Sequence, residues 1–295
     1  MIQFEKVTRK KSKARIALEG PSGAGKTLSA LFLAKGIVGG DWSKVALIDT
    51  EHERARFYAE RADLGIGQFL YAAFYPPYTP ERYKELVNSA AQAVGENGVV
   101  IVDSFSHAWA GEGGVLDIKS EIEKNNSNKN SFSAWNEAGK IQNNLVDTIL
   151  SVPCHTIATL RTKMGYATEV NERGKVVPVK IGLEPVQRDN VEYEFDIVIQ
   201  INQEHVASAS KDTTFLDDWS GIITPGLGEQ LAQWLDKGEE PVRCAECKRA
   251  ILPTPKFTVA QIVERSNAKF GKVLCAACAQ AAVKAAQNAA ETVSE

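Results

Sequence analysis

The stretch GPSGAGKT, residues 20–27, decides the fold class of this chain. It matches the pattern G-x-x-x-x-G-K-T and stands between an apolar run, RIALEG, and a helical pattern, KTLSALFLAKGI. Glycines at positions 20, 23 and 25 let the backbone wrap closely, so that successive N–H groups and a helix N-terminus can cradle phosphate oxygens. The alternative is a glycine-rich turn with a solvated lysine, and the flanking strand and helix disfavour it.

This loop is therefore the candidate nucleotide site. Lys26 supplies a positive charge to the β- and γ-phosphates of ATP, and the hydroxyl of Thr27 is placed to ligate Mg²⁺. The predicted nucleotide-binding residues are Gly20, Pro21, Ser22, Gly23, Ala24, Gly25, Lys26, Thr27, Leu28 and Asp103.

Asp103 belongs to a second motif, GVVIVDS at residues 98–104. Four apolar residues run into this acid, which places it at the carboxyl edge of a buried strand, where open α/β sheets bind ligands. Such a motif alone is weak, but in combination with the phosphate loop it predicts that Asp103 and Thr27 hold the Mg²⁺ ion.

A third strand ends in two acids, in the stretch LIDTEHER at residues 47–54. It follows the helix of the phosphate loop, so we expect it near the strands that end at Gly20 and Asp103. Glu51, just past its end, would then face the γ-phosphate, where a carboxylate can orient and deprotonate the attacking water. Asp49 is expected to support the strand end, and His52 either helps to orient Glu51 or is a solvated loop residue.

Strand and helix patterns alternate along most of the chain, which predicts an α/β fold with a mainly parallel sheet flanked by helices. The polar segment 105–131 is typical of a mobile loop, and residues 164–190 predict a hairpin that turns at 172–174. Strands are expected at 15–20, 44–49, 68–74, 98–103 and 155–160, and helices at 26–37, 53–65, 80–94 and 132–150.

The composition is that of an ordinary soluble protein, with a formal net charge of −3. We find neither a signal peptide nor an apolar run that could span a membrane, so we expect a cytoplasmic protein without a membrane partner. Disulfides are then not expected. Cys154 and the histidines His107, His155 and His205 are interpreted as core, structural or surface residues.

The other four cysteines form the pattern C-x2-C-x27-C-x2-C late in the chain. Four thiolates so paired suit one tetrahedral Zn²⁺ with a structural role, and free thiols or a disulfide are the alternatives. The predicted zinc ligands are Cys244, Cys247, Cys275 and Cys278. We therefore expect an ATPase domain at residues 1–238 and a small zinc module with a helical tail at 239–295.

The motifs together resemble the P-loop ATPase core of RecA-type recombinases. The resemblance rests on GPSGAGKT, ALIDTEHERARFYAERADLGI and VVIVDS, and it implies that Glu51 is the catalytic base and Asp103 the magnesium-coordinating acid. The segments TLRTKMGY and EPVQRDNVEYEFDIVIQI are further similar to phage-encoded, core-only RecA-like ATPases associated with single-strand annealing and recombination. The C-terminal cysteine pattern also resembles zinc-binding tails of phage recombination proteins.

One departure from that family concerns the strand HTIATL. In recombinases the corresponding strand ends in a polar amide pair that senses the γ-phosphate, whereas Arg161 and Lys163 follow here. With Arg188 they are the candidates for γ-phosphate contacts, to the nucleotide of the same or of a neighbouring subunit. For all three residues the alternative is an ordinary surface ion pair, for instance of Arg188 with Asp189 or Glu192.

The resemblance implies that the segments 105–131 and 164–190 bind DNA. Single-strand binders need positive charge and aromatic platforms, and both are present here beside several acids; a flexible lid is the alternative. The residues concerned are Trp109, Lys119, Lys124, Lys129, Phe132 and Trp135 in and beside the first segment, and Lys163, Tyr166, Arg173, Lys175 and Lys180 in the second.

The sequence thus predicts a Mg-ATP-dependent, RecA-like ATPase that binds single-stranded DNA in phage-type recombination or strand annealing. Its expected partners are further copies of the chain, in a ring or filament, and a single-strand-binding or other recombination protein. A P-loop phosphotransferase acting on a small molecule and a nucleotide-gated scaffold are the alternative functions.

Overall fold

The computed structural model describes residues 8–125, 131–170, 176–251, 253–254 and 256–292, without the side chains of 166–170, 176–181 and 286–292. The chain forms two compact units, Lys13–Leu235 and the combination of Met1–Ser12 with Asp236–Glu295. The predicted domain limits 1–238 and 239–295 stay a prediction.

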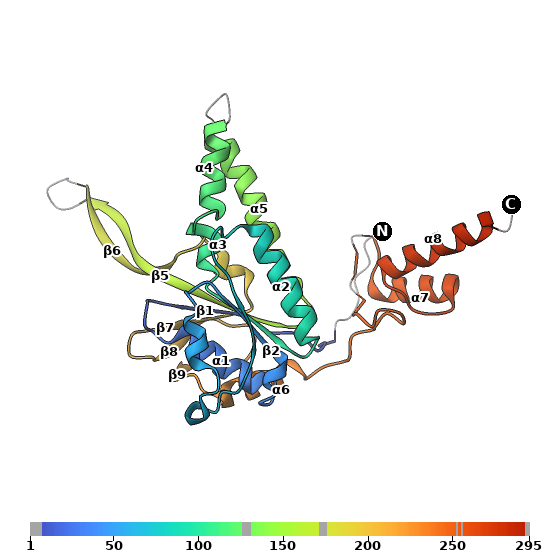
Figure 1. The fold of residues 1–295 in the computed structure, drawn as a ribbon, viewed down its shortest axis with the longest axis horizontal. Helices are drawn as coiled ribbons and strands as arrows, with labels where there is room; N and C mark the ends of the chain where they lie inside the picture. Colours follow the sequence, from blue (N-terminus) through green and yellow to red (C-terminus); the bar gives the residue numbers. More distant parts are fainter. Residues whose placement is uncertain (1–7, 126–130, 171–175, 252, 255, 293–295) are drawn as a thin grey trace. The chain divides into compact units, whose positions relative to one another are not determined.

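A nine-stranded sheet forms the centre of the larger unit in the described part of the chain, in the order β3-β2-β4-β5-β1-β7-β8-β9 with β6 paired to β5 (Figure 1). The strands β3, β2, β4, β5, β1 and β7 are parallel, whereas β6, β8 and β9 pair antiparallel. The mainly parallel sheet is confirmed. The strands are β1 (Arg15–Gly20), β2 (Val45–Asp49), β3 (Leu70–Ala73), β4 (Val99–Asp103), β5 (His155–Val170), β6 (Val176–Pro185), β7 (Ile197–Ile201), β8 (Ala207–Lys211) and β9 (Ser220–Gly221).

Helices cover both faces of this sheet, and its central strands are therefore buried on both sides. On one face α1 (Lys26–Ile37) and α6 (Pro225–Leu235) pack together against residues such as Leu18 and Ile199. On the other, α2 (Pro80–Val94) and α5 (Ser131–Ser151) cover residues such as Val100. Cys154 is fully buried on this second face, as its interpretation as a core residue required.

The predicted mobile loop at residues 105–131 is wrong. Most of this segment is helical, with α3 (Ser106–Ala110) followed by α4 (Val115–Asn125), and only residues 126–130 lie outside the described part. The helix α4 packs against α5, and Val115, Ile118 and Ile122 recur in it at helical spacing. The segment is therefore one arm of a helical hairpin, α4–α5 (Figure 1).

The predicted helix at residues 53–65 is also wrong. The chain instead forms two short 3₁₀ turns, η2 (Arg54–Tyr58) and η3 (Ala62–Leu64), and a third, η1 (Trp42–Lys44), precedes β2. A left-handed backbone at His52, Glu53 and Glu60 interrupts any longer helix. The fourth 3₁₀ turn, η4 (Val191–Glu194), precedes β7.

The predicted hairpin at residues 164–190 is present as β5 and β6. Its ladder runs from Thr162 opposite Pro185 to Val170 opposite Val176. The predicted turn at 172–174 lies outside the described residues, as do the side chains of Tyr166, Arg173, Lys175 and Lys180. The strand β5 therefore passes without a break from the parallel sheet into the hairpin (Figure 1).

The smaller unit contains α7 (Val259–Phe270) and α8 (Ala276–Thr292). Thr258 begins α7 with a capping box. Its hydroxyl accepts from the N–H of Gln261, and the side chain of Gln261 accepts from the N–H of Thr258. Leu274 and Ile251 form a small core with Cys244. In the described part of the chain, no helix has the length and apolar character that crossing a membrane requires.

Candidate nucleotide site and zinc site

The phosphate loop joins the end of β1 to the start of α1. Its backbone needs glycine, since Gly23 and Gly25 have φ values of 83° and 89°. Gly20 packs so closely that a Cβ atom there would lie 2.5 Å from the carbonyl oxygen of Ile201 in β7. The sequence motif therefore encodes both the turn and its contact with the neighbouring strand.

Lys26 folds back onto this loop. Its Nζ donates to the carbonyl oxygens of Gly20 and Pro21, both at 2.8 Å, and burial lowers its pKa. Carbonyl oxygens are weaker partners for an ammonium group than phosphate oxygens. The amine is thus held at the loop, where the oxygens of an anionic ligand can replace these carbonyl oxygens as its partners.

Asp103 is held by two threonine hydroxyls. Thr27 donates to its Oδ2 atom and Thr159 to its Oδ1 atom, each at 2.5 Å. Burial raises the pKa of Asp103, and the two hydroxyls oppose that shift. The adjacent hydroxyl and carboxylate oxygens are hard donors of the kind Mg²⁺ takes together with water and phosphate. The residues predicted to hold magnesium therefore fit that ion, and Thr159 is a supporting residue that the sequence analysis missed.

The turn after β2 is built around the carboxylate of Asp49. Its Oδ1 atom accepts from the N–H of Glu51 at 2.6 Å, and its Oδ2 atom accepts from the N–H of Ala55 at 3.0 Å and the hydroxyl of Tyr71 at 3.1 Å. Asp49 lies directly opposite Asp103 in the β2–β4 ladder. This carboxylate therefore fixes the backbone of Glu51 at the edge of the sheet that carries Asp103.

Glu51 forms a two-point ion pair with Arg161. The guanidinium Nε donates to Oε1 at 2.6 Å and Nη2 donates to Oε2. Burial alone would raise the pKa of Glu51, but the hydrogen bonds and charge of Arg161 overcome it and lower that pKa. The pair raises the pKa of Arg161 in turn. The predicted base and a predicted γ-phosphate contact are thus bound to each other.

His107 lies beside this pair, although the sequence analysis interpreted it as structural or surface. Its Nδ1 atom is 2.6 Å from the hydroxyl of Thr50, and its ring stacks on Tyr78 with centroids 4.9 Å apart. Burial and the charge of Arg161 lower the pKa of His107, so the neutral imidazole is favoured. The only sequence signal for this role of His107 is its position shortly after the strand that ends at Asp103.

His205 is the second histidine that the sequence analysis undervalued. It lies in the turn between β7 and β8, and its Nδ1 atom is 3.0 Å from the carbonyl oxygen of Ala24 in the phosphate loop. A carbonyl only accepts, so this contact requires the proton on Nδ1. By contrast, His155 is buried and accepts from the N–H of Ala14, and burial lowers its pKa to about 3.

Two of the predicted γ-phosphate contacts lie apart from the Glu51–Arg161 pair. Lys163 is exposed and stands opposite Glu184 in the hairpin ladder. Arg188 donates to Asn143 at 2.6 Å and to the carbonyl oxygen of Gly139 at 3.3 Å, both in α5. Among the described residues Arg188 has no ion pair with Asp189 or Glu192, and the catalytic roles of Lys163 and Arg188 stay predictions.

Aromatic and basic side chains gather along α3, α4 and the start of α5. Trp109 stacks on Trp135 with centroids 6.1 Å apart, and the ammonium of Lys119 lies 5.2 Å from the Trp135 ring. Phe132 is 74% exposed. Lys129 lies outside the described residues. These side chains supply the two ingredients of a single-strand surface, although Lys119 is also paired with Glu123.

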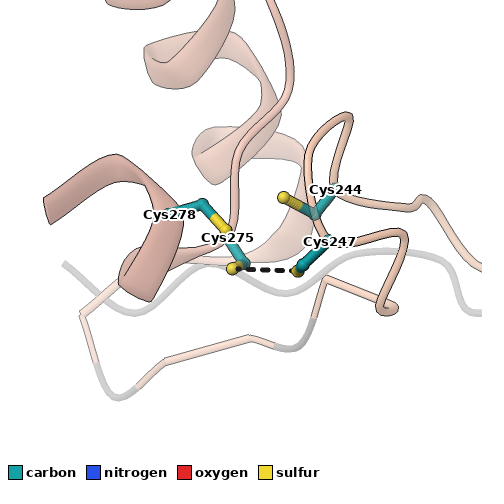
Figure 2. Close-up of side chains that lie close together, drawn as sticks. All are labelled: Cys244, Cys247, Cys275 and Cys278. Atoms are coloured by element: carbon teal, nitrogen blue, oxygen red, sulfur yellow. Dashed lines mark hydrogen bonds between the residues drawn. The ribbon is translucent and has the colours of Figure 1, made fainter. Parts of the chain in front are cut away.

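The four late cysteines converge in the smaller unit (Figure 2). Their Sγ atoms all lie within 4.8 Å of one another, and those of Cys247 and Cys275 are 3.7 Å apart. Tetrahedral zinc with Zn–S bonds of about 2.3 Å needs sulfur–sulfur distances of about 3.8 Å. A hydrogen bond from Arg249 lowers the pKa of Cys247 to about 6, whereas hydrogen bonds with Cys275 and Cys247 raise the pKa of Cys278 to about 12. The donor set therefore fits a structural zinc site.

Three comparisons with known proteins bear on this geometry. A search of curated proteins gives no match. Among solved structures, the KaiC-like protein PH0186 from the hyperthermophilic archaeon Pyrococcus horikoshii OT3 is similar, with 16% identity over 67% of this chain and 78% of that chain and a TM-score of 0.38. The family model described as AAA domain matches residues 12–224, which include the whole phosphate loop and Glu51, Asp103 and Arg161. The chain belongs to this AAA domain family, and it is a P-loop ATPase.

Proposed function

We propose that this ATPase uses Mg-ATP to control its binding of single-stranded DNA in phage-type homologous recombination or strand annealing. One observation carries the proposal. Arg161, which is paired with Glu51, stands in β5 just before that strand enters the β5–β6 hairpin. The same strand thus joins the candidate base to a candidate DNA-binding element.

The chemistry of hydrolysis follows from the site residues. The N–H groups of the loop and Lys26 bind the phosphates, and Thr27 and Asp103 are placed to hold Mg²⁺. The ion, when bound, neutralises charge on the phosphate oxygens. Glu51 accepts the proton of the attacking water, and Asp49 keeps its backbone in position.

Arg161 controls the basicity of Glu51. While the two are paired, the pKa of Glu51 is lowered and the carboxylate is a weak base. The oxygens of a γ-phosphate compete for the guanidinium, and a loss of the pair leaves burial to raise the pKa of Glu51. The position of Arg161 thereby couples hydrolysis to the hairpin through β5.

The α4–α5 hairpin offers a second DNA contact. The Trp109–Trp135 stack and the exposed ring of Phe132 give flat surfaces for bases, and Lys119 gives positive charge. Base stacking on such rings tolerates any sequence, because every base has a π-face. This combination is typical of binding without strong sequence preference.

Assembly into a ring or filament of further copies belongs to the same proposal, with a single-strand-binding or other recombination protein as a second partner. Arg188 is exposed, and its guanidinium lies on the outer surface of α5. In a homo-oligomer, a basic residue so placed can reach the nucleotide of a neighbouring subunit, as arginine fingers do. Arg188→Ala would then lower ATP turnover only under conditions in which the protein assembles.

ATP turnover measured with and without single-stranded DNA tests the proposal. DNA should stimulate turnover, and Glu51→Gln should bind ATP with little change in Kd while kcat falls by about 10²–10⁴. Glu53→Gln is the matched control, since Glu53 is a nearby glutamate that pairs with Arg56 instead. Turnover without DNA stimulation or salt-sensitive DNA binding would contradict the proposal, and full function of Glu51→Gln would favour a nucleotide-gated scaffold.

A further inference from the structure

The zinc module differs in charge from the rest of the chain. Between residues 241 and 285 there are eight lysines and arginines and only two glutamates. The whole chain has 34 basic and 37 acidic residues, so the remaining 250 residues carry 26 basic and 35 acidic ones. A zinc site with four cysteine ligands contributes about two negative charges, because four thiolates surround a divalent ion. Residues 241–285 therefore keep a net charge of about +4 with zinc bound, whereas Glu239, Glu240, Glu291 and Glu295 at the two ends bring the whole of 239–295 close to neutral.

The helix α7 separates its apolar from its basic side chains. Val259 and Ile262 pack into the small core beside the cysteines, whereas Arg265 and Lys269, one helical turn apart, are exposed. The guanidinium of Arg265 lies 4.3 Å from the centroid of the Phe257 ring. In the described part of the module, neither Arg265 nor Lys269 forms an ion pair. Both charges remain available to a partner.

The turn that carries the first cysteine pair, Cys244 and Cys247, adds two more exposed cations. Lys248 and Arg249 follow Cys247 directly and lie in the turn that holds its thiol. Lys272 differs from them, because it is paired with Glu246. We call the five exposed basic residues that have no acidic partner within the described ranges the basic surface; they are Lys248, Lys256, Arg265, Lys269 and Lys284, whereas Arg249 hydrogen-bonds to the thiol of Cys247.

The character of this surface indicates the class of its partner. Among the described residues of the module, Val242 is the one large apolar side chain that is strongly exposed. Surfaces that bind proteins usually contain exposed apolar side chains at their centre, whereas surfaces that bind nucleic acids are polar and positively charged. The guanidinium of Arg265 also lies over the ring of Phe257, and nucleic-acid bases stack on aromatic rings with cation–π contributions from arginine. These features favour a polyanion with flat bases over an acidic peptide.

We propose that the basic surface of the zinc module binds the phosphate backbone of single-stranded nucleic acid without requiring ATP. The choice of single strands rests on the proposed function; the electrostatic argument does not. The module then holds the strand during the whole ATPase cycle, while the ATPase domain grips it in a nucleotide-dependent manner.

Fluorescence anisotropy of a labelled oligothymidylate with the full, zinc-loaded chain in the absence of ATP tests this inference. Arg265→Glu/Lys269→Glu should weaken binding by about 25-fold at 0.1 M salt and reduce the slope of log K against log[salt] by about 1.4, since each single-strand phosphate contact contributes about 0.7. Lys44→Glu/Lys84→Glu makes the same change in net charge on the ATPase domain and should leave both quantities nearly unchanged. Zinc content per chain confirms that the variants keep the module folded.

Equal binding by the module variant and the control would overturn the inference. So would displacement of the oligonucleotide by poly-L-glutamate as readily as by unlabelled oligothymidylate, which would assign the surface to an acidic protein. Phe257→Leu should weaken binding without changing the salt slope. If DNA fails to stimulate ATP turnover but module-dependent binding persists, the proposed function fails and this inference stands.

Discussion

Arg161 holds Glu51 through two parallel hydrogen bonds, although 110 positions separate the two residues in the chain. The carboxylate side chain is 15% exposed and the guanidinium 41% exposed, so the pair is only partly screened by water. The planar fork of arginine matches a carboxylate in geometry and holds it in one orientation. The candidate catalytic base is therefore kept in place by a group whose charge also lowers its basicity.

Arg161→Ala should move the acid limb of the pH profile for kcat/KM to higher pH. Without the guanidinium, burial is the main remaining influence on Glu51, and it raises the pKa of that carboxyl. A base with a raised pKa becomes protonated at higher pH, so activity on the acid side is lost earlier as pH falls. We also expect kcat to fall by about 10² or more, because the proposed donor to the γ-phosphate is lost.

Arg161→Lys is the conservative partner of that variant. Lysine restores the positive charge but cannot make two parallel hydrogen bonds, so the acid limb should return partway towards that of the parent protein. If both variants lose activity while the acid limb stays where it was, Arg161 has a structural role and does not tune Glu51.

Asp49→Asn should lower both stability and kcat. An asparagine has one acceptor oxygen, whereas Asp49 accepts from two N–H groups and one hydroxyl around Glu51, Ala55 and Tyr71. We expect a loss of about 1–2 kcal/mol in the free energy of unfolding, and a fall in kcat of about 10-fold or more as Glu51 shifts. Urea unfolding and ATP turnover measure the two effects.

Tyr71→Phe is the control for Asp49→Asn, because it removes the hydroxyl contact and leaves both backbone contacts intact. It should cost about 1 kcal/mol or less and leave kcat nearly unchanged. A fall in kcat as large as that of Asp49→Asn would instead point to the edge strand β3 as the element that positions Glu51.

The sheet and the phosphate site were predictable because their signals are local. The strands β2 and β4 are apolar runs that end at an acid, β1 is a mainly apolar run that ends at a glycine, and the loop motif fixes its own turn through glycine. The strand ends at Asp49 and Asp103 also meet as expected, since parallel strands place their carboxyl ends at one edge.

The errors have a different physical origin. The segment 105–131 looked like a loop because α4 is mostly polar and its apolar stripe is completed only by packing on α5. The pairing of Glu51 with Arg161 and the contact of His205 with the phosphate loop join distant segments. Neither has a sequence signal, because both depend on strand order and on side-chain orientation.

Each chain should bind one zinc ion through the four late cysteines. Cys275→Ser removes one thiolate of the set and should abolish stoichiometric zinc, while Cys154→Ala, buried just before β5 in the larger unit, should retain it. Metal analysis measures the ion, and amide hydrogen exchange of residues 244–278 should speed up when it is lost. Unchanged zinc content in Cys275→Ser would contradict the site.

Glu19→Gln should stabilise the protein at pH 8 and have little effect at pH 5. Glu19 is 3% exposed; its Oε1 atom has no hydrogen-bond partner among the described residues, and Gln200 donates to Oε2 at 3.4 Å. Burial raises its pKa to about 7, from an ordinary value of 4.5. Between these values the unfolded chain releases the proton and the folded chain keeps it, so stability falls as pH rises through this window.

Above the raised pKa the folded protein bears the whole cost of a buried carboxylate, about 3 kcal/mol for a shift of this size. Glutamine has the same shape and no charge, so it removes that cost at pH 8, whereas at pH 5 the folded wild-type side chain is already neutral. Glu229→Gln, the same change on the exposed surface of α6, should alter the free energy of unfolding by about 0.5 kcal/mol or less at either pH. Urea unfolding at the two pH values measures the difference. Equal effects of Glu19→Gln at pH 5 and pH 8 would mean that Glu19 finds a compensating partner in solution, and that the end of β1 tolerates a charge directly beside the phosphate loop.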